Sequence, residues 1–233
     1  MPNNKPISVG ILGKTYFDNI FFIKEIMPGE TNETSESVQM LGGAYNLIRA
    51  NIDGLKCTHY ECGQKYATII NETENSRRTS FVYGDTNIIG EFIGLGKNDW
   101  LHLAYMDDIN IDVLNKINFC DNISVDFCKA QTRKPFIDFM KKSSIIFDSR
   151  ERKHLYQNVI LDTPLILHDS NGCECIIKGK VSHSSEVKPR TGVSVNGAGD
   201  IFAGFFIREY NYGGLERAVS NTCNLTTSWL IEN

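Results

Sequence analysis

The sequence predicts an α/β fold built on a mostly parallel central sheet. From residue 100 onward, short apolar runs typical of buried strands alternate with segments that have helical spacing. Near the C-terminus, a loop with two glycines leads into Ile201, Phe202, Phe205 and Phe206, whose spacing is that of one helical face. A chain of 233 residues is long enough to bury the core of one such domain.

The composition is that of an ordinary globular protein, with 41% hydrophobic and 22% charged residues. The net charge of −4 provides no overall field for nucleic acid or for an anionic membrane, so we expect neither as a partner. We find no signal-peptide pattern and no apolar run of about 18 residues. The seven cysteines are scattered without a CxxC motif, which favours reduced thiols and a cytoplasmic protein over a metal or disulfide framework.

The first strand is predicted over residues 7–12, ending at Gly13, with Asp18 following five residues later. Residues 8–15 end in Gly-Lys-Thr, like a phosphate-binding P-loop. That loop requires glycine where Ser8 stands and a flexible stretch where residues 9–12 have strand character. We therefore interpret this segment as a strand.

Two segments, around 19–40 and 78–93, have the β-rich and partly polar character of a strand excursion from the core. Between them, Gly42 and Gly43 precede a predicted helix, and the two glycines indicate a tight turn with close backbone approach.

The remaining expected elements follow in order. Strands are predicted over 57–70, 100–104, 123–127, 144–148, 164–168 and 173–177, and helices over 109–117, 136–142, 151–156 and 215–230. In parallel sheets, ligands bind beyond the carboxyl ends of the strands. Asp18, Asp126, Asp148 and the Gly197 loop are all expected at that edge.

The Gly197-Ala198-Gly199 loop is the strongest candidate site. At a helix N-terminus the first N–H groups lack internal partners and the dipole is positive, so the loop can bind an anion. Asp200 adds a carboxylate that could take a proton from an attacking hydroxyl beside a bound phosphate. Aspartate is also favoured at helix starts, so a plain capped helix is the alternative.

The run Asn196-Gly197-Ala198-Gly199-Asp200 resembles the C-terminal signature of the ribokinase/PfkB carbohydrate kinase family. Other features resemble this family in order: Gly13 with Asp18, the Gly42-Gly43 pair with Asn46 behind it, the two β-rich segments, and Asp148 to Glu151. The resemblance implies one ribokinase-like domain over 1–233, a three-layer sandwich with a small β-lid formed by segments around 19–40 and 78–93.

The resemblance also implies a function: transfer of the γ-phosphate of ATP, with Mg²⁺, to a hydroxymethyl group of a sugar or sugar derivative. Asp200 is then the general base, and the backbone amides of Gly197, Ala198 and Gly199 form the anion hole. The other implied roles are substrate binding by Asp18, Gly42, Gly43 and Asn46, nucleotide binding by Asn196, Gly197, Gly199, Gly172 and Asn224 (or Cys223 if the helix alignment slips by one), and indirect metal placement through water by Glu151 and Asp148.

The chain departs from the family pattern in the spacing of Asn46, which comes one residue sooner after the glycine pair than usual, and at three residue positions. Asp148 replaces asparagine in the metal-associated motif, Ser194 stands where aspartate is usual, and Asp169 replaces a frequent glycine near the phosphates. An acid at 169 would repel phosphate unless it points away or meets a cation.

Two other functions stay open at this point. One is a nucleoside kinase of the same fold, with Tyr16, Phe17 or Tyr45 stacking on a base. The other is a catalytically weak sugar-binding protein. Because a small lid sheet has exposed edges, we also expect a homodimer that forms through the β-lid.

Overall fold

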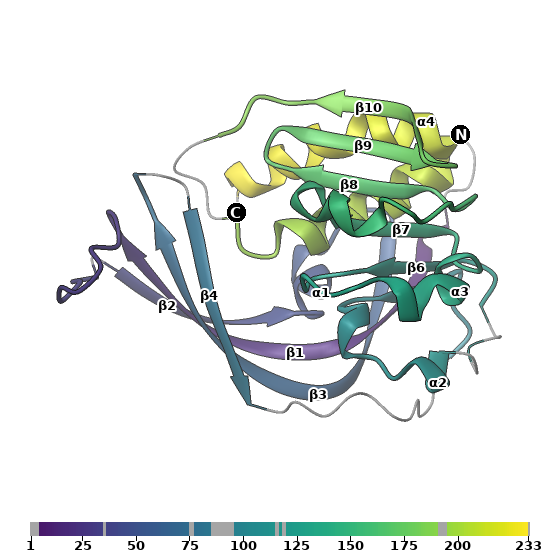
Figure 1. Cartoon of the computed structure of the whole chain (residues 1–233). Helices are drawn as coiled ribbons and strands as arrows, with labels where there is room; N and C mark the ends of the chain where they lie inside the picture. Colours follow the sequence, from purple (N-terminus) through teal and green to yellow (C-terminus); the bar gives the residue numbers. More distant parts are fainter. Residues whose placement is uncertain are drawn as a thin grey trace.

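The computed structural model describes residues 5–34, 36–74, 77–84, 96–114, 117, 120–190 and 195–232. Within these residues the chain forms a layered α/β body from which a group of strands extends at one end (Figure 1). The strands are β1 (Ile7–Ile23), β2 (Glu36–Gly43), β3 (Leu55–Glu72), β4 (Arg77–Gly84), β5 (Trp100–Leu103), β6 (Ile123–Asp126), β7 (Ile145–Ser149), β8 (Leu165–Asp169), β9 (Gly172–Ile177) and β10 (Lys180–Glu186).

The helices are unequal in length. They are α1 (Asn46–Ala50), α2 (Ile111–Leu114), α3 (Ile137–Met140) and α4 (Ala198–Glu232), together with the 3-10 segments η1 (Met106–Asp108), η2 (Lys134–Phe136) and η3 (Arg150–Tyr156). The backbone of α4 is non-helical at Gly213 and Gly214, so two helices meet there, as the sequence predicts. The helix expected over 109–117 is shorter than predicted, with α2 covering only its middle.

All described strands join one ten-stranded sheet in the order β10-β9-β8-β7-β6-β5-β1-β3-β4, with β2 paired to β1. The central pairs from β3 through β8 are parallel, and the pairs involving β2, β4, β9 and β10 are antiparallel. The predicted α/β class with a mostly parallel sheet is confirmed. The strand β10 was not predicted, because its residues are mostly polar and exposed.

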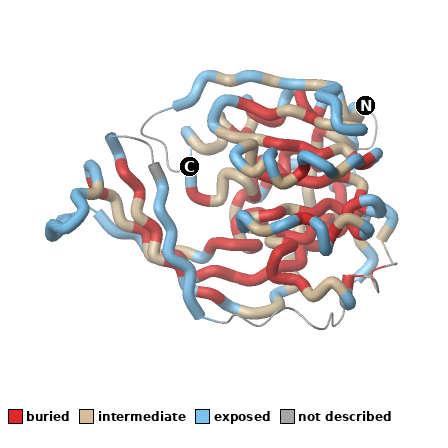
Figure 2. The backbone as a smooth tube through the Cα atoms, in the orientation of Figure 1, coloured by how far each residue is buried: buried red, intermediate tan, exposed pale blue. Residues whose placement is uncertain are grey.

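Two hydrophobic cores cover the two faces of the sheet. Neighbouring residues of one strand enter opposite cores, since strand side chains alternate: Phe147 packs under α4 and α1, whereas Ile146 packs toward α2 and α3. Figure 2 shows the buried strands between these layers. Phe206 of α4 is fully buried in the first core, where truncation to alanine typically costs about 3–5 kcal/mol. This packing fixes the N-terminus of α4 against the sheet.

The lid is a continuation of the body, because β1 and β3 run through both. Val9–Leu12 of β1 pair with β5 in the body, and Thr15–Phe22 pair with β2 in the lid. The prediction that the strand ends at Gly13 is wrong: a register shift between Gly13 and Thr15 bends the strand, which then continues. The lid therefore comprises β2, β4 and the outer halves of β1 and β3; residues 85–93 of the predicted lid lie outside the described residues.

The Gly-Lys-Thr sequence lies within β1, and Lys14 and Thr15 are both buried there. A P-loop needs these residues at a loop-to-helix junction, so the interpretation as a strand is confirmed. No helix in the described part of the chain is long and apolar enough to cross a membrane.

Candidate active site

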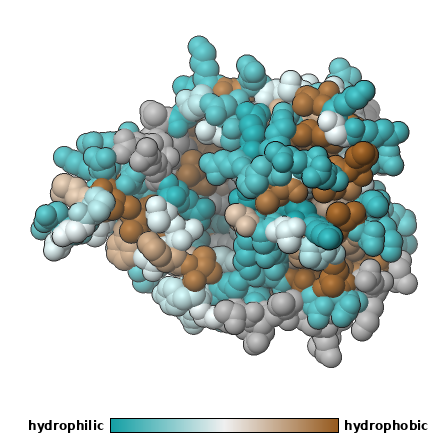
Figure 3. Space-filling view, viewed as in Figure 1, coloured by the Kyte–Doolittle hydropathy of each residue, from teal (hydrophilic) through white to brown (hydrophobic). Residues whose placement is uncertain are grey.

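Two cavities meet at the N-terminus of α4. The lid cavity, about 340 Å³, lies between the lid strands and the carboxyl ends of the body strands, and includes Asp18, Asn46 and Asp200 in its wall. The α4 cavity, about 460 Å³, is lined by residues from both parts of α4, Phe202 near its start and Cys223 to Leu230 near its end. The residues that line both are Arg78, Ser149, His168, Val195, Ala198 and Gly199. Figure 3 shows a hollow between the lid and the body whose visible walls are largely hydrophilic.

Asp200 lies in the first turn of α4, is 5% exposed and faces the lid cavity. Its Oδ2 accepts hydrogen bonds from Asn46 Nδ2 at 2.9 Å and from the Tyr105 hydroxyl at 3.3 Å. Burial raises the pKa of Asp200 to about 6, although the two hydrogen bonds and the charge of Arg78 oppose this shift. A carboxylate with this pKa can accept a proton near neutral pH.

The loop before Asp200 depends on a glycine. Gly197 has φ of +75°, and a Cβ at this position would meet the Asn46 side chain at 2.6 Å. The expected hole of three amides is only partly free, because the Ala198 N–H donates to the carbonyl of Val195 at 3.2 Å. Among the described residues the N–H groups of Gly197 and Gly199 have no such acceptor, so they remain available to an anion.

The expected substrate residues converge on the same cavity. Asp18 is 6% exposed, its Oδ1 is buried without a hydrogen-bond partner among the described residues, and burial raises its pKa. A Cβ on Gly42 would clash with the Asp18 carboxylate, so this glycine makes room for it. Gly43 lines the cavity in a left-handed conformation with φ of +65°, and Asn46 begins α1 beside it.

Several residues of the lid cavity were missed or discounted in the sequence. Tyr105 has a left-handed backbone with φ of 61°, and its ring stacks on Tyr16 with centroids 5.2 Å apart. Arg78 extends from β4 to the junction of the two cavities, where its charge partly offsets the rise that burial causes in the pKa values of Asp18 and Asp200. His168 stacks on Phe202 at 4.4 Å, and burial lowers its pKa to about 4, so it is neutral at pH 7. No local sequence motif identifies these residues, because only the tertiary fold brings them together.

The wall of the α4 cavity combines apolar and polar groups. Cys223, Thr226, Thr227 and Leu230 of α4 line it, at the spacing of one helical face. Asn224 was expected there, but it is exposed and absent from the lining. Successive side chains of a helix point about 100° apart, so a shift of one position moves a side chain off the lining face. The position one residue earlier, Cys223, lies in the wall instead.

Gly172 and Asn196, also expected on the nucleotide side, line neither cavity. Gly172 has φ of +136°, and a Cβ there would clash with the carbonyl of Ser185. Glycine is therefore required at this position because β10 approaches closely. Asn196 is buried behind the loop, and its amide has no partner among the described residues. Ser194 lies outside the described residues. Asp169 does meet a cation, since Arg150 Nη1 lies 3.3 Å from its carboxylate.

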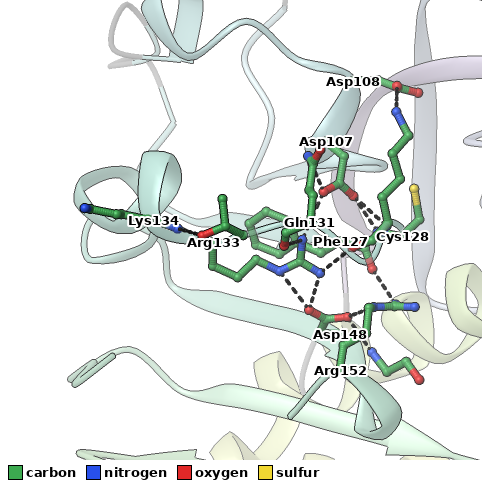
Figure 4. Close-up of polar contacts among 12 residues, drawn as sticks. Asp107, Asp108, Phe127, Cys128, Gln131, Arg133, Lys134, Asp148 and Arg152 are labelled. Atoms are coloured by element: carbon green, nitrogen blue, oxygen red, sulfur yellow. Dashed lines mark hydrogen bonds and ion pairs between the residues drawn. The ribbon is translucent and has the colours of Figure 1, made fainter. Parts of the chain in front are cut away.

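Asp148, expected to help place a metal, belongs instead to a buried ion cluster (Figure 4). Its Oδ2 accepts from Arg133 Nη2 at 2.7 Å, Arg133 Nε at 3.1 Å and the Tyr156 hydroxyl at 2.6 Å. Its Oδ1 accepts from the Ser149 N–H and from Arg152 Nε. Five donors occupy the lone pairs of this carboxylate, which leaves little capacity for metal-bound water.

Glu151, the other expected metal residue, is exposed at the start of η3 and lines the α4 cavity. Its backbone N–H is capped by the Ser149 hydroxyl at 3.4 Å. A single carboxylate in this wall suits Mg²⁺, which keeps several waters and takes one or two carboxylates with substrate phosphates.

Comparisons with known proteins agree with this arrangement at the level of the fold. No protein-family model and no curated protein sequence matches the chain. Among solved structures, a Burkholderia thailandensis nucleoside kinase in complex with inosine matches with TM-score 0.69 and 11% identity, covering 94% of this chain and 89% of that one. A Cryptococcus neoformans ribokinase in complex with ADP matches with TM-score 0.66 and 13% identity, covering 97% and 92%.

A third match is an Arabidopsis thaliana ribokinase complexed with ribose and ATP, with TM-score 0.63, 12% identity, and coverage of 96% of this chain and 91% of that one. The three matches extend over nearly the whole length of both chains. They show that this chain has the ribokinase fold, which confirms the fold that the sequence resemblance implies.

Proposed function

We propose that this protein is an ATP-dependent kinase that phosphorylates a hydroxymethyl group of a sugar or sugar derivative. One observation carries the proposal: the buried Asp200 carboxylate stands at a helix N-terminus where two cavities meet, with Ala198 and Gly199 in the walls of both. In this proposal the lid cavity binds the acceptor and the α4 cavity binds the phosphate donor. The inosine, ribose, ADP and ATP complexes of proteins with this fold support the assignment of two small-molecule sites.

Asp200 acts as the general base. Asn46 and Tyr105 hold one carboxylate oxygen, which leaves the other oriented for the acceptor hydroxyl. As the acceptor oxygen forms its bond to the γ-phosphorus, its proton passes to Asp200 and the bond to the leaving ADP breaks. Asp18 accepts hydrogen bonds from other acceptor hydroxyls, as its unpartnered Oδ1 suggests.

The developing negative charge on the phosphoryl group is met by the N–H groups of Gly197 and Gly199 and by the positive end of the α4 dipole. Arg78 brings a guanidinium to the same junction from the lid. When bound, Mg²⁺ neutralises phosphate charge; Glu151 would hold it through water. Asp148 is omitted from this role because its oxygens are occupied by protein donors.

A nucleoside kinase is the second candidate, since a nucleoside also offers a ribose hydroxymethyl group. The stacked Tyr16 and Tyr105 rings in the lid cavity favour it, because an aromatic surface can bind a base. Phe17 and Tyr45 do not support this role: Phe17 stacks on Tyr66 on the outer face of the lid, and Tyr45 contacts His59.

A screen of acceptors with ATP and Mg²⁺ tests the proposal. Ketoses, aldoses, glycosylamines and nucleosides are incubated with the protein, ADP release is followed, and the product is identified by phosphorus NMR. We expect one acceptor class to release ADP in proportion to a new phosphate ester. A protein that binds sugars in calorimetry but ignores ATP and Mg²⁺ would instead be a sugar-binding protein with a kinase fold.

We further propose that two chains pair through their lids. On the outer lid face Phe17, Tyr66 and Tyr83 form an aromatic stack, with centroids 5.4 and 5.7 Å apart, and all three side chains are exposed. Burying such a row of aromatic side chains stabilises association. Light scattering at micromolar concentration should give the mass of a dimer, and the variant Tyr66→Lys should give a monomer.

A further inference from the structure

The lid cavity contains a pair of lysines that the mechanism above does not use. Lys65 of β3 and Lys129 after β6 both line it, on elements far apart in the sequence. Their Nζ atoms contact the two oxygens of one carboxylate, Asp108: Lys65 to Oδ2 at 2.7 Å, and Lys129 to Oδ1 at 2.5 Å. Two ammonium groups are therefore held side by side on one anion.

The position of Lys129 is fixed through its backbone. Its N–H donates to Asp107 Oδ2 at 3.0 Å, and its carbonyl accepts from Arg133 Nη2 at 2.9 Å. Arg133 and Asp107 are fully buried and bonded to each other at 3.1 Å (Figure 4). Two hydrogen bonds to buried groups thus hold the Lys129 backbone, while its side chain remains 44% exposed in the cavity wall and accessible to a ligand.

Charge counting shows that this wall of the cavity is positive. Asp107 and Asp148 are balanced by Arg133 and Arg152, which leaves Lys65 and Lys129 against Asp108 alone. The Asp126 carboxyl also lines the cavity; burial, Asp200 and Asp148 raise its pKa well above the usual range, which favours its neutral form. This group of side chains therefore has one positive charge in excess, whereas Asp18 and Asp200 bring negative charge to the part of the cavity assigned to the acceptor hydroxyls.

The lysines also have donors to spare. An ammonium group has three N–H donors, and in the described part of the chain each lysine uses one of them on Asp108. The Lys65 side chain is only 7% exposed and lies 5.7 Å from the centre of the Tyr16 ring, so water screens its charge poorly. An anionic group in this cavity would gain charge-assisted hydrogen bonds from both.

We propose that the acceptor carries an anionic substituent, a carboxylate or a phosphate ester, that binds between Lys65 and Lys129 while its hydroxymethyl group lies at Asp200. This inference rests on the proposed kinase function and narrows its substrate class to sugar acids or phosphosugars. The cavity residues then have separate tasks: the Asp18 carboxylate and the Asn46 amide bind hydroxyls, and the two lysines bind the anion.

Matched acceptors test the inference. Gluconate is compared with sorbitol, and fructose 1-phosphate with fructose, so that each pair differs in the anionic group and retains a hydroxymethyl group. We expect kcat/KM for at least one anionic acceptor to exceed that of its neutral partner by about tenfold or more, as charged hydrogen bonds provide. The pair that shows the preference distinguishes a carboxylate from a phosphate ester.

The variant Lys129→Met should reduce that ratio to about one, whereas Lys141→Met, which removes an exposed lysine of the same charge outside both cavities, should preserve it. Equal or better turnover of both neutral acceptors, or an unchanged ratio in Lys129→Met, overturns the anion site and leaves the kinase intact. If no acceptor is phosphorylated, calorimetry without ATP separates the two ideas. Binding of gluconate or fructose 1-phosphate that Lys129→Met abolishes supports the anion site alone, and no binding overturns it too.

Discussion

The two cavities of this protein differ in how firmly the fold defines them. In the lid cavity, Asp18, Asn46 and Asp200 are each less than a tenth exposed, and hydrogen bonds or glycine contacts fix their positions. In the α4 cavity, much of the wall comes from exposed side chains such as Glu151, Ser170 and Lys188. The proposed acceptor side is therefore formed by buried and fixed groups, whereas the proposed donor side is formed largely by exposed ones, so we expect substitutions to affect the acceptor side more.

From this difference between the two cavities, we expect Gly42 to be the position where a single added methyl group lowers activity most. In Gly42→Ala the new Cβ displaces the Asp18 carboxylate, so kcat/KM for the acceptor should fall about 100-fold, the loss typical of a misplaced binding group. The KM for ATP should change less than about twofold. Steady-state kinetics in both substrates measures this. Gln39→Ala, an exposed change on the same strand, is the control, and an equal loss in both variants would contradict the role of Gly42.

On the donor side we predict a smaller effect that depends on the phase of α4. Thr227→Phe inserts a ring into the α4 cavity and should raise the KM for ATP about tenfold, which corresponds to about 1.4 kcal/mol of lost binding. Asn224→Phe adds the same ring on the exposed side of the helix, so its KM for ATP should stay near that of the unmodified protein. If the two variants behave alike, the nucleotide does not bind along this face.

The pH dependence of kcat/KM for the acceptor should follow the ionisation of Asp200 in the lid cavity. Asp200 must be ionised to act as a base, so kcat/KM for the acceptor at saturating ATP should fall as the pH drops through about 6, approaching tenfold per pH unit below it. In Asn46→Ala the carboxylate loses a hydrogen bond that lowers its pKa, so the acid limb should move to higher pH. A limb that stays in place in this variant would belong to another group.

The raised pKa of Asp200 also predicts how the stability of the protein depends on pH. Because the pKa of Asp200 is raised above its ordinary value of 3.8 in the folded state, the folded protein holds this proton more tightly than the unfolded chain. The stability that Asp200 contributes is fully present below pH 3.8 and is lost as the pH rises through about 6. Asp200→Asn should therefore match or exceed the thermal stability of the unmodified protein at pH 7.5, as thermal denaturation can test.

The local sequence was sufficient to predict much of the fold and part of the candidate site. The Gly197–Asp200 run predicts its own loop and helix start, because backbone freedom and helix capping are local properties. The short apolar runs that alternate with helical segments predicted the parallel strands, because hydrophobic periodicity is also a local property of the sequence. The continuation of β1 past Gly13 was missed, because a bulge bends a strand without a sequence signal as clear as a turn.

Long-range contacts account for what sequence reasoning missed. Lys65, Tyr105 and Lys129 meet in one cavity only because β3, β5 and β6 lie near one another in the sheet. Asp148 has the residue type and position of a metal-placing group, but its carboxylate is bound by Arg133, which lies 15 residues away in the sequence. The choice between Asn224 and Cys223 depended on helix phase, where an error of one residue reverses a side chain from buried to exposed.

The central claim is that Asp200 accepts the proton of the acceptor hydroxyl while the phosphoryl group passes from the α4 cavity to the lid cavity. The most direct test compares the unmodified protein with Asp200→Asn in transfer of the γ-phosphate of labelled ATP to the best acceptor from the screen, with calorimetric acceptor binding measured on both. We predict that the substitution lowers kcat by about 10²–10⁴-fold and changes acceptor affinity by less than about threefold. Comparable kcat values in the two proteins would contradict the account.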